Sequence, residues 1–71
     1  MQPETMEITV NGEARQVRSG ESVATLLASL EIASERVAVE LNRAIVRKRD
    51  WSETLVPEGS KIEIVEFVGG G

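Results

Sequence analysis

A β-hairpin of defined register is predicted near the start of the chain by residues 6–18, MEITVNGEARQVR. Apolar and polar residues alternate along its first half, which is the period of a strand with one buried face. Asn11-Gly12 then supplies the two positive φ angles that a type I′ turn requires. A two-residue turn places Met6 opposite Val17 and so sets the pairing of the whole hairpin. The return strand carries fewer apolar side chains, and we expect it at an edge of the sheet.

A short amphipathic helix is predicted to follow the hairpin. Ser19-Gly20 should end the second strand, and Ser22 is a suitable N-cap because its hydroxyl can accept a hydrogen bond from an amide of the first helical turn. Four apolar residues then recur with the spacing i, i+3, i+4 and i+7, namely Val23, Leu26, Leu27 and Leu30. This spacing forms one apolar stripe. Because so short a helix has little stability of its own, we expect the stripe to dock on a sheet.

Three extended segments are predicted in the second half of the chain. Residues 37–41, VAVEL, should form a strand that turns at Asn42-Arg43. Residues 44–46 should be briefly extended, and residues 61–68 should form the last strand. We interpret Asn42 as a turn residue rather than a substrate ligand.

A single helical turn is predicted between the second and third of these segments. Asp50-Trp51-Ser52-Glu53 has the acceptor-x-x-Glu form of a capping box. Trp51 and Leu55, four residues apart, should share one face of that turn. We interpret Trp51 as a packing residue of a small core, because it is the only tryptophan of the chain.

The element order β-β-α-β-(β)-β predicts an α+β domain with a mixed sheet of four or five strands, one main helix on one face and a short helical turn. A right-handed strand–helix–strand crossover leaves room for the last strand beside the first. This is the architecture of a β-grasp, or ubiquitin-like, roll. We expect a flexible leader at residues 1–5, the β-grasp domain at residues 6–68 and a flexible glycine tail at residues 69–71.

The composition argues against an independent enzyme. The 71 residues include neither cysteine nor histidine, which removes thiol nucleophiles, thiolate metal sites, disulfides and the usual proton shuttle at neutral pH. We expect no bound cofactor or metal. The net charge of −4 gives no general support for binding nucleic acid. No apolar run approaches the roughly 20 residues of a membrane span and no signal peptide is recognisable, so we expect a cytoplasmic protein that does not bind membranes.

The last predicted strand is apolar on both faces. We place Ile62 and Ile64 under the helix and leave Val65 and Phe67 on the opposite face, where no helix covers them. Exposed apolar side chains there would form a docking surface, and we predict that Val65, Phe67 and Val68 contact partner proteins. Two alternatives are open at this point, namely that both sides are core or that the register is inverted.

The terminal glycines are the main chemical feature of the sequence. In extended form Gly69-Gly70-Gly71 reach about 10 Å beyond the last strand, and without side chains they can enter a slot too narrow for any Cβ. Such a tail delivers one unhindered group, the carboxylate of Gly71, which becomes an acyl electrophile when it is joined to AMP. The alternative is a frayed end or a cloning remnant without function.

Four stretches that cover nearly the whole chain carry a resemblance to a known family. They are MEITVNGE, VATLLASL, VAVELNRAIVRKRDW and EGSKIEIVEFVGGG. The third is the most discriminating, with a strand of the form A-V-x-L-N, an I-V pair and a tryptophan shortly after, ahead of the C-terminal Gly-Gly. In these stretches the sequence resembles the ThiS family, the sulfur-carrier proteins of thiamin biosynthesis. Molybdopterin-synthase small subunits and ubiquitin-like modifiers tend to be longer and lack the third stretch.

The resemblance implies a mechanism and a set of partners. In this family an E1-like adenylyltransferase of the ThiF type adenylates the terminal glycine with ATP. Sulfur from a cysteine desulfurase system then replaces AMP, and the thiocarboxylate is delivered to a thiazole synthase of the ThiG type. The resemblance implies that Gly71 is the modified residue and that Gly70 and the more permissive Gly69 are required for activation. The free carrier is expected to be a monomer.

Other functions are open on the sequence alone. A ubiquitin-like modifier would use the same activated tail with a lysine as acceptor, and a related carrier could serve a molybdopterin-type pathway. A ubiquitin-like RNA-binding accessory module would need a basic face. The chain holds one basic cluster, formed by Arg43, Arg47, Lys48 and Arg49, which we interpret as a solvated loop.

Overall fold

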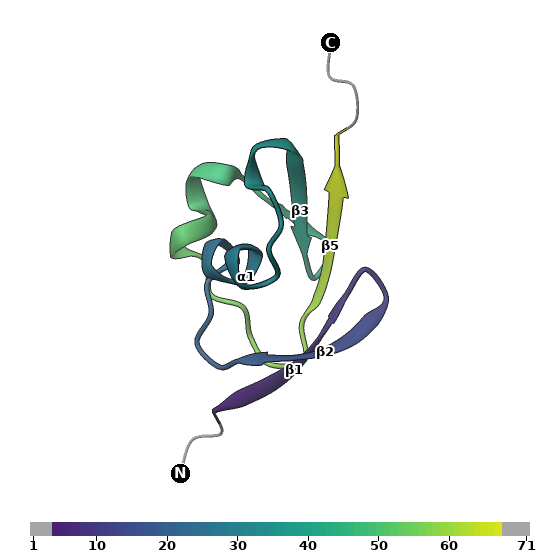
Figure 1. The fold of residues 1–71 in the computed structure, drawn as a ribbon, viewed down its shortest axis with the longest axis vertical. Helices are drawn as coiled ribbons and strands as arrows, with labels where there is room; N and C mark the ends of the chain where they lie inside the picture. Colours follow the sequence, from purple (N-terminus) through teal and green to yellow (C-terminus); the bar gives the residue numbers. More distant parts are fainter. Residues whose placement is uncertain (1–3, 68–71) are drawn as a thin grey trace.

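The computed structural model describes residues 4–67, which form a five-stranded mixed sheet covered by helices on one face (Figure 1). The strand order is β2-β1-β5-β3-β4. The strands are β1 (Thr5–Val10), β2 (Glu13–Arg18), β3 (Val37–Leu41), β4 (Ala44–Val46) and β5 (Lys61–Glu66). β1 and β5 are parallel, and the other neighbouring pairs are antiparallel. The predicted β-grasp architecture, with the last strand beside the first, is confirmed.

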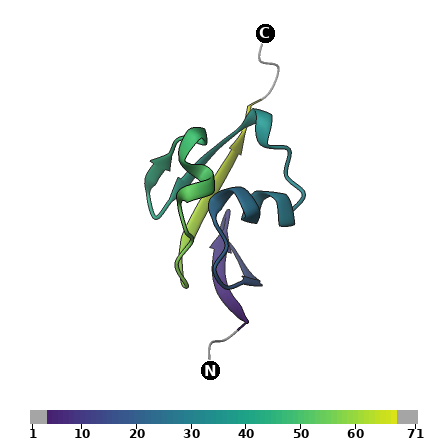
Figure 2. The same cartoon turned by 90° about the vertical axis from the view of Figure 1, so that its left-hand side faces the viewer.

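The helix α1 (Val23–Ser29) and the 3₁₀ helix η2 (Lys48–Glu53) lie on the same side of the sheet (Figure 2). A second 3₁₀ turn, η1 (Ser34–Arg36), leads into β3. The predicted stripe of α1 docks on the sheet, since its first three members are buried and Leu30 is partly buried. No described helix covers the opposite face, which we call the open face.

The β1–β2 hairpin has the predicted register. Met6 lies opposite Val17, and the turn residues Asn11 and Gly12 take φ angles of 50° and 84°. These angles lie in the left-handed region that a type I′ turn needs. β2 is an edge strand in which Val17 alone is buried, as its weak apolar pattern predicts.

The ends of the sheet differ slightly from the prediction. β1 begins at Thr5, a residue that the sequence assigned to the leader, and Thr5 pairs with Arg18 of β2. β5 ends at Glu66, although the N–H of Phe67 still donates to the carbonyl of Arg36 at 2.6 Å. Glu4 of the predicted leader is also described, and its carbonyl accepts a hydrogen bond from the N–H of Ser19 at 3.1 Å. Residues 1–3, and Val68 with the glycine tail, lie outside the described residues.

The capping box of this chain lies at α1 and not at η2. The Ser22 hydroxyl accepts a hydrogen bond from the Thr25 N–H at 3.1 Å, and the Thr25 hydroxyl accepts one from the Ser22 N–H at 2.9 Å. Threonine thus performs the return contact that glutamate or glutamine usually makes. The predicted box at residues 50–53 is wrong, because η2 begins at Lys48 and its N-cap, Arg47, makes no side-chain hydrogen bond to the helix.

Trp51 is a core residue, as predicted, but it does not share a face with Leu55. Trp51 is 5% exposed and its Nε1–H donates to the carbonyl of Val46 at 2.9 Å, whereas Leu55 is 64% exposed. The prediction assumed the spacing of an α-helix. η2 is a tighter 3₁₀ helix that ends at Glu53, so Leu55 lies beyond it and forms a bridge with Ser22.

The hydrophobic core lies between the helices and the sheet. Its buried members are Met6, Ile8, Val10, Val17, Val23, Leu26, Leu27, Val37, Val39, Trp51, Val56 and Ile62. Ile64 packs against this core from a partly buried position. The predicted placement of Ile62 and Ile64 on the helix side of β5 is therefore confirmed.

Candidate functional site

Two asparagine side chains hold the strand that leads to the glycine tail. Asn11 Nδ2 donates to the carbonyl of Ile64 at 3.1 Å, and Asn11 Oδ1 accepts from the N–H of Ile64 at 2.7 Å. On the other edge of β5, Asn42 Oδ1 accepts from the N–H of Lys61 at 2.9 Å, and the Asn42 N–H donates to the carbonyl of Lys61 at 2.8 Å. Each asparagine pairs with β5 as a residue of a neighbouring strand would.

Sequence reasoning found both asparagines only as turn residues. Asn42 and Arg43 do form a turn, with φ angles of 51° and 74°. The contact of Asn11 with Ile64 joins residues 53 positions apart, and no local pattern signals it. These contacts help to set the position of β5 and hence the direction in which the chain leaves the sheet.

Val65 and Phe67 lie on the open face of the sheet. They are 58% and 54% exposed, and Val65 pairs with Ala38 of β3. Because Ile62 is 1% exposed on the other side of the same strand, neither a fully buried strand nor an inverted register describes β5. The predicted exposure of Val65 and Phe67 is confirmed, and their contact with partners stays a prediction.

A third large apolar side chain belongs to this face and was missed by the sequence interpretation. Ile45 of β4 is 74% exposed and lies opposite Glu40 of β3. The signal was present in the alternation, since the next residue, Val46, pairs with the core residue Val39 and successive side chains point to opposite faces. We call Ile45, Val65 and Phe67 together the open-face patch.

Two carboxylates lie beside the open-face patch. Glu40 and Glu63 are directly opposite each other on β3 and β5, and they share the open face with Val65 because all three alternate with core residues. Like charges at directly opposed positions of a sheet are locally unfavourable. A partner surface that combines apolar area with a basic residue would relieve this repulsion.

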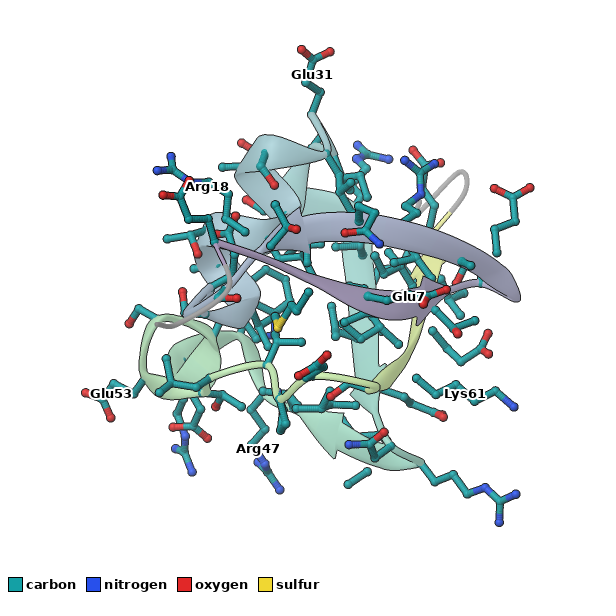
Figure 3. The ribbon with its side chains drawn as sticks, turned by 90° about the horizontal axis from the view of Figure 1, so that it is seen from below. Glu7, Arg18, Glu31, Arg47, Glu53 and Lys61 are labelled. Carbon is teal, nitrogen blue, oxygen red and sulfur yellow. The ribbon has the colours of Figure 1, made fainter. Side chains whose placement is uncertain are left out.

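The basic cluster does not form a separate basic face. Its four side chains are exposed, and two of them, Arg47 and Arg49, line a shallow hollow together with the carboxylates of Asp50 and Glu53. Figure 3 shows that the side chains of Arg47, just before η2, and Glu53, at the end of η2, both point outward. The exposure of the cluster agrees with the predicted solvation, but the predicted loop is only partly correct, because Lys48 and Arg49 lie in η2.

The predicted reactive residues and one predicted contact, Gly69–Gly71 and Val68, lie outside the described residues. Among residues 4–67 there is no group of three or more histidine, cysteine, aspartate or glutamate side chains that could hold a metal ion. None of the described helices is long and apolar enough to cross a membrane.

Comparison with known proteins places these features in a family. Residues 5–71 match the ThiS family. The chain is similar to the sulfur carrier protein ThiS of Escherichia coli, with 30% identity over 66 residues that cover 93% of this chain and 100% of that protein. It is also similar to the thiazole synthases of Paramagnetospirillum magneticum and Magnetococcus marinus, at 42% and 39% identity, but it spans only 20% of the length of each.

The fold gives the same result. The crystal structure of the thiamine biosynthesis protein ThiS from Geobacter metallireducens superposes with a TM-score of 0.83 at 36% identity, covering 93% of this chain and 100% of that one. The family match runs from the first residue of β1 through the open-face patch to the last glycine. The chain belongs to the ThiS family.

Proposed function

We propose that this chain is a sulfur carrier for the thiazole moiety of thiamin, and that it acts as a co-substrate of partner enzymes rather than as an enzyme. The observation that carries the proposal is the family match over residues 5–71, which includes Gly69–Gly71. The similarity to thiazole synthases supports the thiazole branch of the pathway.

The reacting group is the carboxylate of Gly71. An E1-like adenylyltransferase of the ThiF type binds ATP, and a carboxylate oxygen attacks the α-phosphorus, so that pyrophosphate leaves and an acyl adenylate forms. The outer sulfur of a persulfide that a cysteine desulfurase has formed on a partner protein then attacks the acyl carbon, and AMP leaves. A cysteine thiol of the partner attacks the resulting acyl disulfide at the partner's sulfur, so that the thiol ends in a disulfide and the acyl group keeps the sulfur. The resulting thiocarboxylate passes to a thiazole synthase of the ThiG type. Because the chain has no cysteine, a thiol of its own cannot hold the sulfur, and an acyl group can.

The open-face patch docks the activating enzyme. Its three side chains are all more than half exposed, and apolar residues that are grouped and exposed on a small domain favour protein contact. The paired carboxylates Glu40 and Glu63 favour a basic residue on the partner surface. The carrier binds no cofactor itself, is a monomer when free, and works in the cytoplasm, where ATP is available to its partner.

The proposal is tested by intact mass spectrometry of the 71-residue chain after incubation with ATP, a cognate E1-like enzyme and a sulfur donor. We expect a mass gain equal to the replacement of one oxygen by sulfur, located at Gly71 by fragmentation. A variant that lacks Gly70 and Gly71 should keep its thermal unfolding transition and gain no sulfur. An unchanged carboxylate in the presence of an enzyme that is active on its own carrier would refute the proposal, as would attachment of the tail to a lysine.

The docking role is tested with two matched substitutions. Phe67→Ser removes a 54% exposed apolar side chain from the open-face patch, and Leu55→Ser removes a 64% exposed one from elsewhere. We expect Phe67→Ser to raise the KM of the activating enzyme for the carrier about tenfold and Leu55→Ser to leave it nearly unchanged. Equal effects of the two substitutions would contradict docking at the open face.

A further inference from the structure

We infer that a groove beside the exit of β5, on the helix side of the sheet, receives an extended and positively charged segment of the enzyme that activates the tail. The groove is separate from the open-face patch, which lies on the other face. The identity of the enzyme rests on the proposed function, whereas the chemistry of the segment is argued from the groove itself.

The sheet is incomplete at this point. β1 pairs with β5 only through Thr9 with Lys61 and Val10 with Ile62, because the chain turns away at Asn11. The Asn11 side chain supplies one more pairing position, at Ile64. β5 itself continues to Glu66. Its last residues therefore have a paired strand on the β3 side and, among residues 4–67, none on the β1 side.

The direction of the backbone groups shows which edge is open. The carbonyl of Lys61 and the N–H of Phe67 both bond to the β3 side, to Asn42 and Arg36. Successive residues of a strand present their N–H and C=O groups to opposite edges. The groups of Glu66, the residue before Phe67, therefore point to the β1 side. No backbone group of residues 4–67 pairs with Glu66 there. An extended segment could hydrogen-bond to this edge, which is the usual mode of strand addition.

The groove itself accommodates an apolar side chain of such a segment. It has a volume of about 440 Å³, and its apolar lining comes from Ile32, Ala33, Val37 and Ile64. A strand that continued β1 would place a core-facing side chain beside Ile64 of β5, on the edge of β5 that faces away from β3. Because that strand is missing, the space it would fill is open.

The rim of the groove is negatively charged. Glu31 and Glu66 border it, and Figure 3 shows the Glu31 side chain projecting away from the domain. The overall charge of the chain is also negative, at −4. This rim disfavours the chain's own tail, which ends in the carboxylate of Gly71, and favours a segment that carries lysine or arginine.

Glu31 can be substituted to test this surface, because its backbone conformation and its charge are both unfavourable for local stability. It follows α1 at a position with φ of 60°, where its N–H bonds to the carbonyl of Ala28 and the next N–H, of Ile32, bonds to that of Leu27. This is a Schellman motif, whose left-handed residue is usually glycine. A negative charge at the C-terminus of a helix is unfavourable as well.

The first experiment needs no enzyme. The ¹⁵N-labelled chain is titrated with the peptide acetyl-Lys-Ile-Arg-Ile-Lys-amide up to about 5 mM, and acetyl-Glu-Ile-Glu-Ile-Glu-amide is the control. We expect the basic peptide to shift the amide resonances of Glu66, Ile32 and Ala33. Those of β2, an edge strand that does not line the groove, should stay unchanged. No shift at these residues, or the same shift with the acidic peptide, would overturn the inference.

The second experiment measures stability and activation together. Glu31→Gly should raise the Tm, because it removes both local penalties, and should raise the KM of the activating enzyme for the carrier about two- to fivefold, because it removes one exposed charge contact. Glu31→Gln should raise the KM similarly with a smaller change in Tm. A purely structural role predicts a higher Tm with an unchanged KM, and that result would contradict the inference.

A substitution that fills the groove gives an independent control. Ala33 is exposed in the groove, and Ala44 is exposed on β4, the far edge strand. Ala33→Trp should raise the KM about tenfold, and Ala44→Trp should not. If the wild-type chain gains no sulfur with an active cognate enzyme, the proposed function fails, and the peptide titration still decides whether the groove binds a basic segment.

Discussion

The contact between Asn11 and β5 can be isolated by the substitution Asn11→Gly. Glycine accepts the φ of 50° that Asn11 adopts, so the type I′ turn of the hairpin survives. What is lost is the pair of hydrogen bonds to the N–H and carbonyl of Ile64, at 2.7 and 3.1 Å. The substitution therefore removes a tertiary contact without changing the local turn.

The expected loss of stability follows from these two bonds. A typical intramolecular hydrogen bond contributes about 0.5–1.5 kcal/mol net, and because Asn11 is exposed we expect the lower half of that range for each bond. The greater freedom of glycine in the unfolded chain adds about 0.5 kcal/mol. The free energy of unfolding should fall by about 1.5–2.5 kcal/mol, which for a domain of this size lowers the Tm by about 10 °C.

Asn42→Gly is the matched control. Asn42 has a φ of 51° and its side chain makes one hydrogen bond to β5, from the N–H of Lys61, whereas Asn11 makes two. The glycine entropy is common to both variants, so their difference should equal one exposed hydrogen bond, about 0.5–1 kcal/mol. Urea unfolding followed by circular dichroism measures both free energies.

Amide hydrogen exchange locates the effect. Asn11→Gly should speed exchange at the N–H of Ile64 and spare that of Lys61, and Asn42→Gly should do the reverse, because each variant removes the acceptor of only one of these amides. Equal destabilisation by the two variants, or unchanged exchange at Ile64 in Asn11→Gly, would refute the assignment of Asn11 as a contact that holds β5.

Three further substitutions test the fold by urea unfolding or thermal denaturation. Leu26→Ala should lower the free energy of unfolding by about 2–5 kcal/mol because Leu26 is 1% exposed, and a loss below about 1 kcal/mol would show that the site collapses or is not core. Arg43→Gly should stabilise the chain by about 1 kcal/mol because Arg43 has a φ of 74°; a lower Tm would mean that its side chain makes a compensating contact. Ser22→Ala should cost about 1 kcal/mol through loss of the bond from Thr25 to the N-cap, and no change would show that the capping box contributes nothing.

Several elements followed from the sequence because local rules govern them. The hairpin register depends on a two-residue turn at Asn11-Gly12, and it was predicted to the residue. The stripe on α1 and the two faces of β5 follow from side-chain periodicity, so the burial of Ile62 and the exposure of Phe67 were also predicted. The prediction that Gly71 is the modified residue came from the resemblance of the whole chain to a family, and it stays a prediction.

The errors have equally definite causes. The acceptor-x-x-Glu pattern at residues 50–53 was read as a helix start, but the same pattern can lie within a short 3₁₀ helix whose position is set by the burial of Trp51. The capping box at α1 was not predicted, because its second member is Thr25 rather than the usual glutamate or glutamine. Ile45 was overlooked because a three-residue strand is too short for its alternation to stand out.

The sequence by itself determined the strands, the helix and which side of each is apolar, because these properties depend on neighbours a few residues apart. Only the tertiary structure decided that the Asn11 side chain bonds to Ile64 and that Ile45 lies on the same face as Val65 and Phe67. It also decided that β5 extends beyond its pairing with β1 and that a groove lies at this edge. The physical reason is the same in each case. These features arise where segments distant in the chain meet in the sheet, and the residues that meet there carry no mark of their partners in the local pattern.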